Sequence, residues 1–134
     1  HRSDVAAALL ALDARLHTTH RELPLGELYR LPDEADRSTT TLEPGELILE
    51  VELPPVEASV YLKAMDRKRW SFPQVGVAAA RSGSGTRIAL AGVAPIPWLL
   101  GGPEDIDRAT PLPRTAWKAD VARALVRRAL AQLA

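Results

Sequence analysis

The sequence contains no cysteine among its 134 residues. This absence excludes disulfide bonds, thiolate zinc sites, iron–sulfur ligation and a cysteine nucleophile within these residues. Basic and acidic residues number 17 each, and a net charge of zero argues against a protein whose main ligand is a nucleic-acid backbone. No apolar run approaches the roughly 20 residues that cross a bilayer, and no signal peptide begins the sequence. The composition, with 46% hydrophobic and 25% charged residues, predicts an ordinary folded domain, alone or with a remnant of a second.

The first third of the chain begins with a helical pattern. The sequence starts at His1 rather than at a methionine, so we expect a piece of a longer polypeptide. Ser3 supplies a capping hydroxyl and Asp4 an acid for the first turn, ahead of apolar residues at helical spacing. The expected elements are a helix over 5–16, two short strands within 16–25 joined by a turn at 18–21, a helical turn over 25–31 and a polar loop over 32–41.

The segment 46–53 alternates with period two, which predicts a strand. One face carries Leu47, Leu49, Val51 and Leu53, and the other carries Glu46, Ile48, Glu50 and Glu52. Ile48 is therefore the one apolar residue on an acidic face, where either solvent or a flat ligand can meet it. Pro54 and Pro55 end the strand because neither can donate to a ladder.

Three more strands are predicted over 58–65, 74–81 and 86–94, and together with 46–53 they make a four-strand meander. The last two are joined by a short glycine-containing hairpin loop. Periodicity is then lost until residue 113. Thr115 can cap a final helix, whose apolar stripe is Trp117, Val121, Leu125 and Ala129. This order predicts an α+β fold, an antiparallel meander of about four strands packed with helices, preceded by a small helix and short strands.

Histidine and serine give no catalytic or metal centre. His17 and His20 have a spacing found in metal sites, but on a strand or turn their side chains do not share a face, and no carboxylate ligand is patterned nearby. Ser3, Asp4 and His1 cannot easily form a hydrolase triad at a helix start, so capping is the expected role of Ser3. No nucleophile, metal set or acid–base pair of an independent small-molecule enzyme is visible.

A basic cluster with two aromatic residues follows the predicted strand 58–65. Its members are Lys63, Arg67, Lys68, Arg69, Trp70 and Phe72. The cluster either binds an anion or stacks a planar ring, or it is a solvated hairpin whose two aromatics fold back on the core. Lys63 is the most constrained cation because it lies within the strand, with Tyr61 and Met65 on its own face.

Ordered motifs carry a family resemblance over nearly the whole chain. They are HRSD at 1–4, LPLGELY at 23–29, LEPGELI at 42–48, VELP at 51–54, YLK at 61–63, RIALAGVAP at 87–95 and LVRRAL at 125–130. In this order the motifs resemble the medium, FAD-binding subunit of the molybdenum hydroxylases, of the xanthine dehydrogenase and aldehyde dehydrogenase type. Where many of those subunits have an acid after the basic loop, this sequence has Ser71-Phe72-Pro73.

The resemblance implies a division of the chain and three cofactor contacts. Residues 1–55 would be the C-terminal remnant of a vanillyl-alcohol-oxidase-type FAD-binding domain, and residues 56–134 a carbon monoxide dehydrogenase flavoprotein C-terminal-like domain. Asp4 would touch the FAD, Ile48 would lie against it, and Lys63 would approach the flavin end. The glycine-rich segments that hold the FAD pyrophosphate in this family would belong upstream.

The resemblance also implies a function and partners. The subunit would relay electrons from iron–sulfur clusters through FAD to an acceptor, beside a molybdenum-cofactor subunit and an iron–sulfur subunit. The upstream half of its FAD-binding domain would be a further partner, and the isolated fragment would be inactive. The alternative is a non-catalytic docking scaffold that has lost the flavin. We expect a cytoplasmic protein, with the periplasm as the alternative compartment.

Overall fold

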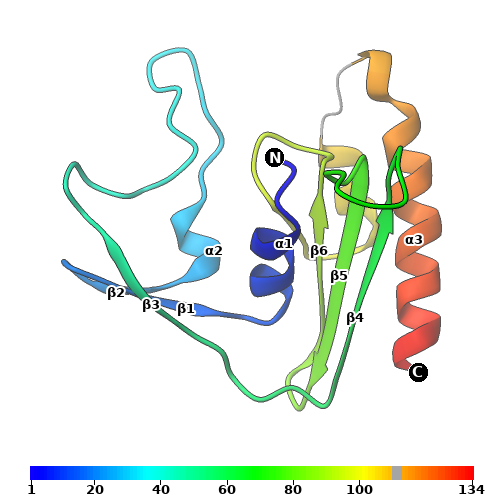
Figure 1. Cartoon of the computed structure of the whole chain (residues 1–134), viewed down its shortest axis with the longest axis horizontal. Coiled ribbons are helices and arrows are strands. Elements are labelled where there is room, and N and C mark those ends of the chain that lie inside the picture. The colour runs from blue at the N-terminus through cyan, green and yellow to red at the C-terminus, as the bar shows by residue number, and fades with distance from the viewer. Residues whose placement is uncertain (110–112) are drawn as a thin grey trace.

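The computed structural model describes residues 1–109 and 113–134 and places a central helix between two antiparallel sheets (Figure 1). A second long helix covers the other face of the larger sheet. The elements are α1 (Asp4–Ala11), β1 (Arg15–Thr18), β2 (Glu22–Pro24), α2 (Leu25–Leu28), β3 (Ile48–Glu52), β4 (Ala58–Ala64), β5 (Val75–Ser82), β6 (Gly85–Ala91), β7 (Trp98–Leu100), the 3₁₀ helices η1 (Pro103–Ala109) and η2 (Pro113–Thr115), and α3 (Trp117–Leu133). The predicted α+β class is confirmed.

The predicted meander has the right number of strands but one wrong member. The larger sheet has the order β4-β5-β6-β7, whereas β3 belongs to the smaller sheet, of order β2-β1-β3. In that sheet Val51 of β3 lies opposite Leu16 of β1. The tandem prolines after β3 break the ladder before β4 begins, so the chain changes sheets there. β7, which completes the larger sheet, is only three residues long and has no readable periodicity.

Strand β5 is covered on both faces, which explains its almost continuous run of small apolar residues. Val77 and Ala79 face α3 and contribute to one core, while Ala78 faces α1 and contributes to a second core. The second core also contains Leu16 and Leu23 of the smaller sheet. Helix α1 therefore joins the two sheets through buried side chains, and this fixes where its first turn lies relative to β4 and β5.

The first helix is shorter than predicted. We expected it to continue to residue 16, but it ends at Ala11, with Leu12 as its C-cap. Asp13 adopts a left-handed conformation with φ of 58°, and the amide of Ala14 turns back to donate to the carbonyl of Leu9 at 3.0 Å. Leu16, read as part of the helical stripe, is instead a buried residue of β1. The apolar spacing over 5–16 is compatible with one helix, but in the structure it belongs to a helix followed by a strand.

Three further predictions are wrong in the last third of the chain. The N-cap of α3 is Ala116, without a side-chain cap bond, rather than Thr115. Trp117 is 46% exposed and does not belong to the buried face. Leu125 and Ala129 of the predicted stripe are buried, and the buried face also contains Lys118, Ala122, Val126 and Leu133. The segment after residue 94, expected to be irregular, contains β7 and η1. Within the described ranges, no helix is both long and apolar enough to span a membrane.

Candidate functional site

The first turn of α1 presents a carboxylate toward strand β4. Ser3 caps the helix as predicted, because its hydroxyl oxygen accepts from the amide of Ala6 at 3.0 Å. Asp4 follows in the first turn, where the positive end of the helix dipole favours an anion. The local sequence thus fixes the start of the helix and places an acidic side chain in its first turn.

Lys63 and Tyr61 of β4 hold the two oxygens of that carboxylate. The ammonium of Lys63 donates to Oδ2 of Asp4 at 2.7 Å, and the hydroxyl of Tyr61 donates to Oδ1. The two donors are separated by one residue on the strand, so they project from the same face, the one that α1 covers. The side chains of Lys63 and Asp4 are 20% and 37% exposed, so water screens the pair only partly.

The phenol of Tyr61 is a donor at any ordinary pH. Burial raises its pKa far above the usual range, and the hydrogen bond and negative charge of Asp4 raise it further. The hydroxyl therefore keeps its proton and donates a hydrogen bond to the carboxylate. Sequence reasoning noted Tyr61 only as a neighbour of Lys63, although the one-residue separation on a strand was the signal that both reach the same partner.

An open pocket of about 430 Å³ lies over the Asp4–Lys63 pair. Its other lining residues are Trp70, Ser71 and Phe72. Trp70 is 94% exposed and Phe72 is 71% exposed, so the two aromatic rings do not fold back on the core. The loop that carries them is shaped locally, since Trp70 has a left-handed φ of 56° and its carbonyl accepts from Arg67 at 2.9 Å. Of the two sequence alternatives, the solvated hairpin with buried aromatics is wrong.

This arrangement has the chemistry of a site for a flat, partly anionic ligand. A pocket of this size falls at the lower end of the roughly 300–1,000 Å³ common for ligand sites. Exposed aromatic faces stack on planar rings. An ammonium offers three donors, of which Lys63 uses one on Asp4, so the others remain for a ligand carbonyl or a negative charge.

Ile48 lies apart from this pocket. It is the first residue of β3 in the smaller sheet, opposite Thr18 at an irregularity in the β1–β3 pairing. Its side chain is 43% exposed, and Asp4 and Lys63 line the pocket without it. The structure thus brings two of the three candidate residues together and leaves the third on an exposed strand. The apolar face of β3 is also open, with Leu47 63%, Leu49 67% and Leu53 51% exposed.

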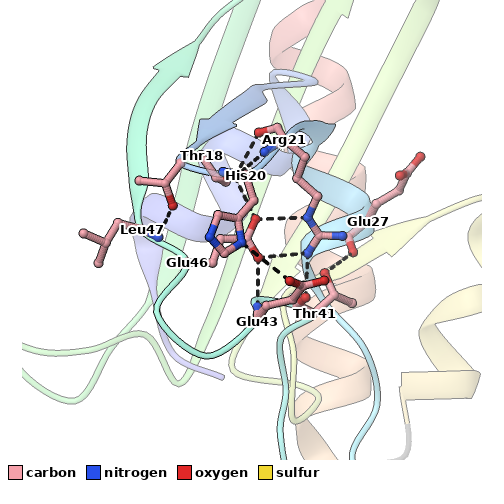
Figure 2. Close-up of polar contacts among 9 residues, drawn as sticks. Thr18, His20, Arg21, Glu27, Thr41, Glu43, Glu46 and Leu47 are labelled. Carbon is pink, nitrogen blue, oxygen red and sulfur yellow. Dashed lines mark hydrogen bonds and ion pairs between the residues drawn. The ribbon is translucent and has the colours of Figure 1, made fainter.

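A buried glutamate anchors the segment that leads into β3 (Figure 2). The side chain of Glu46 is fully buried, and Arg21 approaches it with Nε at 3.0 Å and Nη2 at 3.2 Å. The hydroxyl of Thr18 and the amide of Glu43 donate to the same carboxylate at 2.7 and 2.8 Å. The Arg21 bond, then the backbone and threonine bonds, lower the pKa of Glu46 to about 2. The donors come from the protein itself, so this cluster is a structural clamp that sets the position of Ile48.

His17 pairs with carboxylates on two neighbouring strands, and His20 pairs with a carboxylate outside the strands. His17 on β1 contacts Glu22 on β2 at 3.1 Å and Glu52 on β3 at 3.3 Å, and its bond to Glu52 is the main cause of a raised pKa. His20 lies 3.5 Å from Glu43. Among residues 1–109 and 113–134, no group of three or more histidine, aspartate and glutamate side chains is arranged to hold a metal ion.

Comparison with known proteins finds similarity to an FAD-binding subunit. No family model matches the chain. The FAD-binding subunit PaoB of aldehyde oxidoreductase from Escherichia coli strain K12 is 40% identical over an alignment of 108 residues that covers 75% of this chain. The chain is therefore similar to a part of an oxidoreductase FAD-binding subunit. It spans about a third of the length of the E. coli subunit, 34%.

Three solved structures share the fold of this chain. A carbon monoxide dehydrogenase from Hydrogenophaga pseudoflava that lacks the Mo-pyranopterin moiety matches with a TM-score of 0.76 at 23% identity, over 96% of this chain and 55% of that chain. The cyanide-inactivated Cu,Mo-CO dehydrogenase matches with a TM-score of 0.71 at 21% identity, over 95% and 55%. Reconstituted CO dehydrogenase from Oligotropha carboxidovorans matches with a TM-score of 0.66 at 22% identity, with the same coverage.

Proposed function

We propose that this chain is part of the FAD-binding subunit of a molybdenum-containing oxidoreductase and contributes one wall of the flavin site. The observation that carries the proposal is that the paired Asp4 and Lys63 line one pocket together with the exposed Trp70 and Phe72. The relation to an E. coli FAD-binding subunit supports the same cofactor. The partners would be a molybdenum-cofactor subunit and an iron–sulfur subunit, with electrons entering from iron–sulfur clusters and leaving to an acceptor.

The pocket suits one part of FAD rather than the whole dinucleotide. Its volume of about 430 Å³ matches a ring system, and the aromatic residues provide stacking surfaces for it. FAD, when bound, supplies a carrier that accepts and passes on electrons. Lys63 would place a positive charge near the ring edge, which stabilises negative charge on reduction and raises the reduction potential. Asp4 would orient that ammonium. The phosphates would be held by glycine-rich backbone outside this chain.

Two further elements belong to the proposal. Ile48 would contact another part of the same cofactor, and its exposure on β3 leaves it free to do so. The chain would divide near Pro55 into the end of an FAD-binding domain and a carbon monoxide dehydrogenase flavoprotein C-terminal-like domain. The change of sheet between Glu52 and Ala58 supports this boundary. Helix α1 nevertheless packs on β5 and β6, so the two parts would share a core.

The test compares FAD binding in two variants that each lose one lysine. The 134-residue chain, and a chimera in which it replaces the matching residues of the E. coli subunit, are purified and titrated with FAD. Bound flavin is followed by its absorbance near 450 nm. Lys63→Ala should weaken FAD binding by about 1–3 kcal/mol, or about 5- to 150-fold, because it removes a charge-assisted contact. Lys68→Ala is the control, since Lys68 is an exposed cation in the loop after β4 and does not line the pocket.

The outcomes separate two functions. A yellow chimera whose flavin is lost in Lys63→Ala but kept in Lys68→Ala supports the electron relay. A folded but colourless chimera, with no FAD binding by the chain, favours a docking scaffold without flavin. If Lys63→Ala and Lys68→Ala have equal effects, the charge of the loop matters and the specific contact of Lys63 is refuted.

A further inference from the structure

We infer that Tyr61 is a positioning residue of this site, which fixes the Asp4 carboxylate so that the Lys63 ammonium faces the pocket, and that Gly76 is required to make room for its hydroxyl. The inference rests on the proposed function. It concerns two residues outside the three cofactor contacts suggested by family resemblance. Tyr61 does not line the pocket over the ion pair, so its effect on a ligand would pass through Asp4.

The two oxygens of the Asp4 carboxylate have different donors. Oδ1 accepts from Tyr61 and Oδ2 accepts from Lys63, so each donor has its own oxygen. With one oxygen held by the strand, rotation of the carboxylate about its Cβ–Cγ bond would break the Tyr61 bond. Lys63 therefore finds its acceptor in a fixed place, and its remaining donors keep one direction. Without the phenol, the carboxylate can turn and draw the ammonium with it.

Gly76 of β5 leaves space for the hydroxyl of Tyr61. Gly76 lies opposite Lys63 in the β4–β5 ladder, on the face where Tyr61 and α1 pack. A Cβ built on Gly76 would lie 3.0 Å from Cζ of Tyr61, and closer still to its hydroxyl oxygen. It would also lie 3.3 Å from Cβ of Ala91. A glycine within a strand interior commonly marks a close approach, and here the group that approaches is the tyrosine hydroxyl.

The experiment removes the hydroxyl and keeps the ring. Tyr61→Phe, Asp4→Asn and the double variant are made in the 134-residue chain and in the chimera, and FAD dissociation constants are measured. We expect Tyr61→Phe to weaken FAD binding by about 3- to 10-fold, the usual range for one hydrogen bond. In the Asp4→Asn background the same change should have a smaller effect, because the amide oxygen still accepts from the phenol but no longer holds the Lys63 ammonium by charge. A purely structural role would reduce stability and give additive losses in both backgrounds.

Two variants sharpen the comparison. Gly76→Ala should reproduce the FAD defect of Tyr61→Phe, because the new methyl group displaces the hydroxyl. Tyr29→Phe is the control, since Tyr29 is also about half-buried and lies outside the pocket. It should leave FAD affinity within about 2-fold of wild type. Equal losses in Tyr29→Phe and Tyr61→Phe would overturn the inference.

A second readout separates this inference from the proposed function. Urea unfolding is measured in the chain without FAD for wild type, Asp4→Asn, Tyr61→Phe and the double variant. The two residues share one hydrogen bond, so the loss of stability in the double variant should be smaller than the sum of the two single losses. If wild type binds no FAD, the proposed function fails, and this cycle still decides whether Asp4 and Tyr61 are coupled. If the single losses simply add in the double variant, the positioning role is refuted whatever happens with FAD.

Discussion

Replacing Asp4 with asparagine keeps the shape of the side chain and removes its charge. Three contributions are lost or weakened: the attraction to Lys63 at 2.7 Å, the favourable position in the first turn of α1, and the charge assistance to the Tyr61 bond. A partly exposed ion pair contributes about 0.2–1 kcal/mol, and an acid at a helix start about 0.3–1 kcal/mol. We therefore expect Asp4→Asn to lower the free energy of unfolding by about 1–2 kcal/mol.

Urea unfolding followed by circular dichroism measures this loss. For a chain of this length it corresponds to a fall in Tm of about 3–7 °C. Asp120→Asn is the matched control, because Asp120 also stands in the first turn of a helix and pairs with Arg123 at 2.8 Å. Its side chain is 83% exposed, so the control should lose less than about 0.5 kcal/mol. Equal losses in the two variants, or none in Asp4→Asn, would refute the account of the Asp4–Lys63 contact.

Three other predictions concern stability and pH. The lowered pKa of Glu46, about 2, stabilises the fold above the ordinary pKa of 4.5, and this stabilisation is lost as the pH falls toward 2. Glu46→Gln should therefore narrow the difference between the free energies of unfolding at pH 6 and pH 3, measured by urea titration. The raised pKa of His17 acts in the opposite sense: it stabilises the fold below pH 6.5, and this stabilisation is lost as the pH rises through the higher pKa of the folded state. The prediction is contradicted if His17→Gln keeps the wild-type dependence of the free energy of unfolding on pH between 5.5 and 8.5. Leu90→Ala should lower the free energy of unfolding by about 2–5 kcal/mol, because Leu90 is fully buried against α3; equilibrium denaturation checks it, and a loss below 1 kcal/mol would be inconsistent with that core.

The sequence predicted most elements because their signals are local. The cap at Ser3, the two-residue alternation around Val51 and the prolines after β3 each depend on neighbouring residues only. The partner of β3 could not be read in the same way, because pairing with β1 joins residues more than thirty positions apart. The nearest strand along the chain looked like the natural partner, and only the packing of Leu16 against the core of α1 decides otherwise.

The same distinction between local and long-range signals applies to the residues of the site. Asp4 and Lys63 were candidates through family resemblance, and the structure explains them by one ion pair. Tyr61 and Gly76 escaped notice as a pair because their contact requires the β4–β5 register, which no single segment encodes. The exposure of Trp70 and Phe72 was equally unreadable, since an apolar aromatic residue in a loop is compatible with either burial or solvent.

The most direct test of the flavin site uses the three tryptophan indoles as reporters. The chain is labelled with ¹⁵N and titrated with FAD, and the three indole N–H signals are followed by NMR. Trp70 lines the pocket, whereas Trp98 donates its indole N–H to the carbonyl of Asp105 and Trp117 begins α3. The account predicts a shift or broadening of the Trp70 signal while the other two remain in place. An unmoved Trp70 signal up to millimolar FAD, or equal movement of all three, would contradict it.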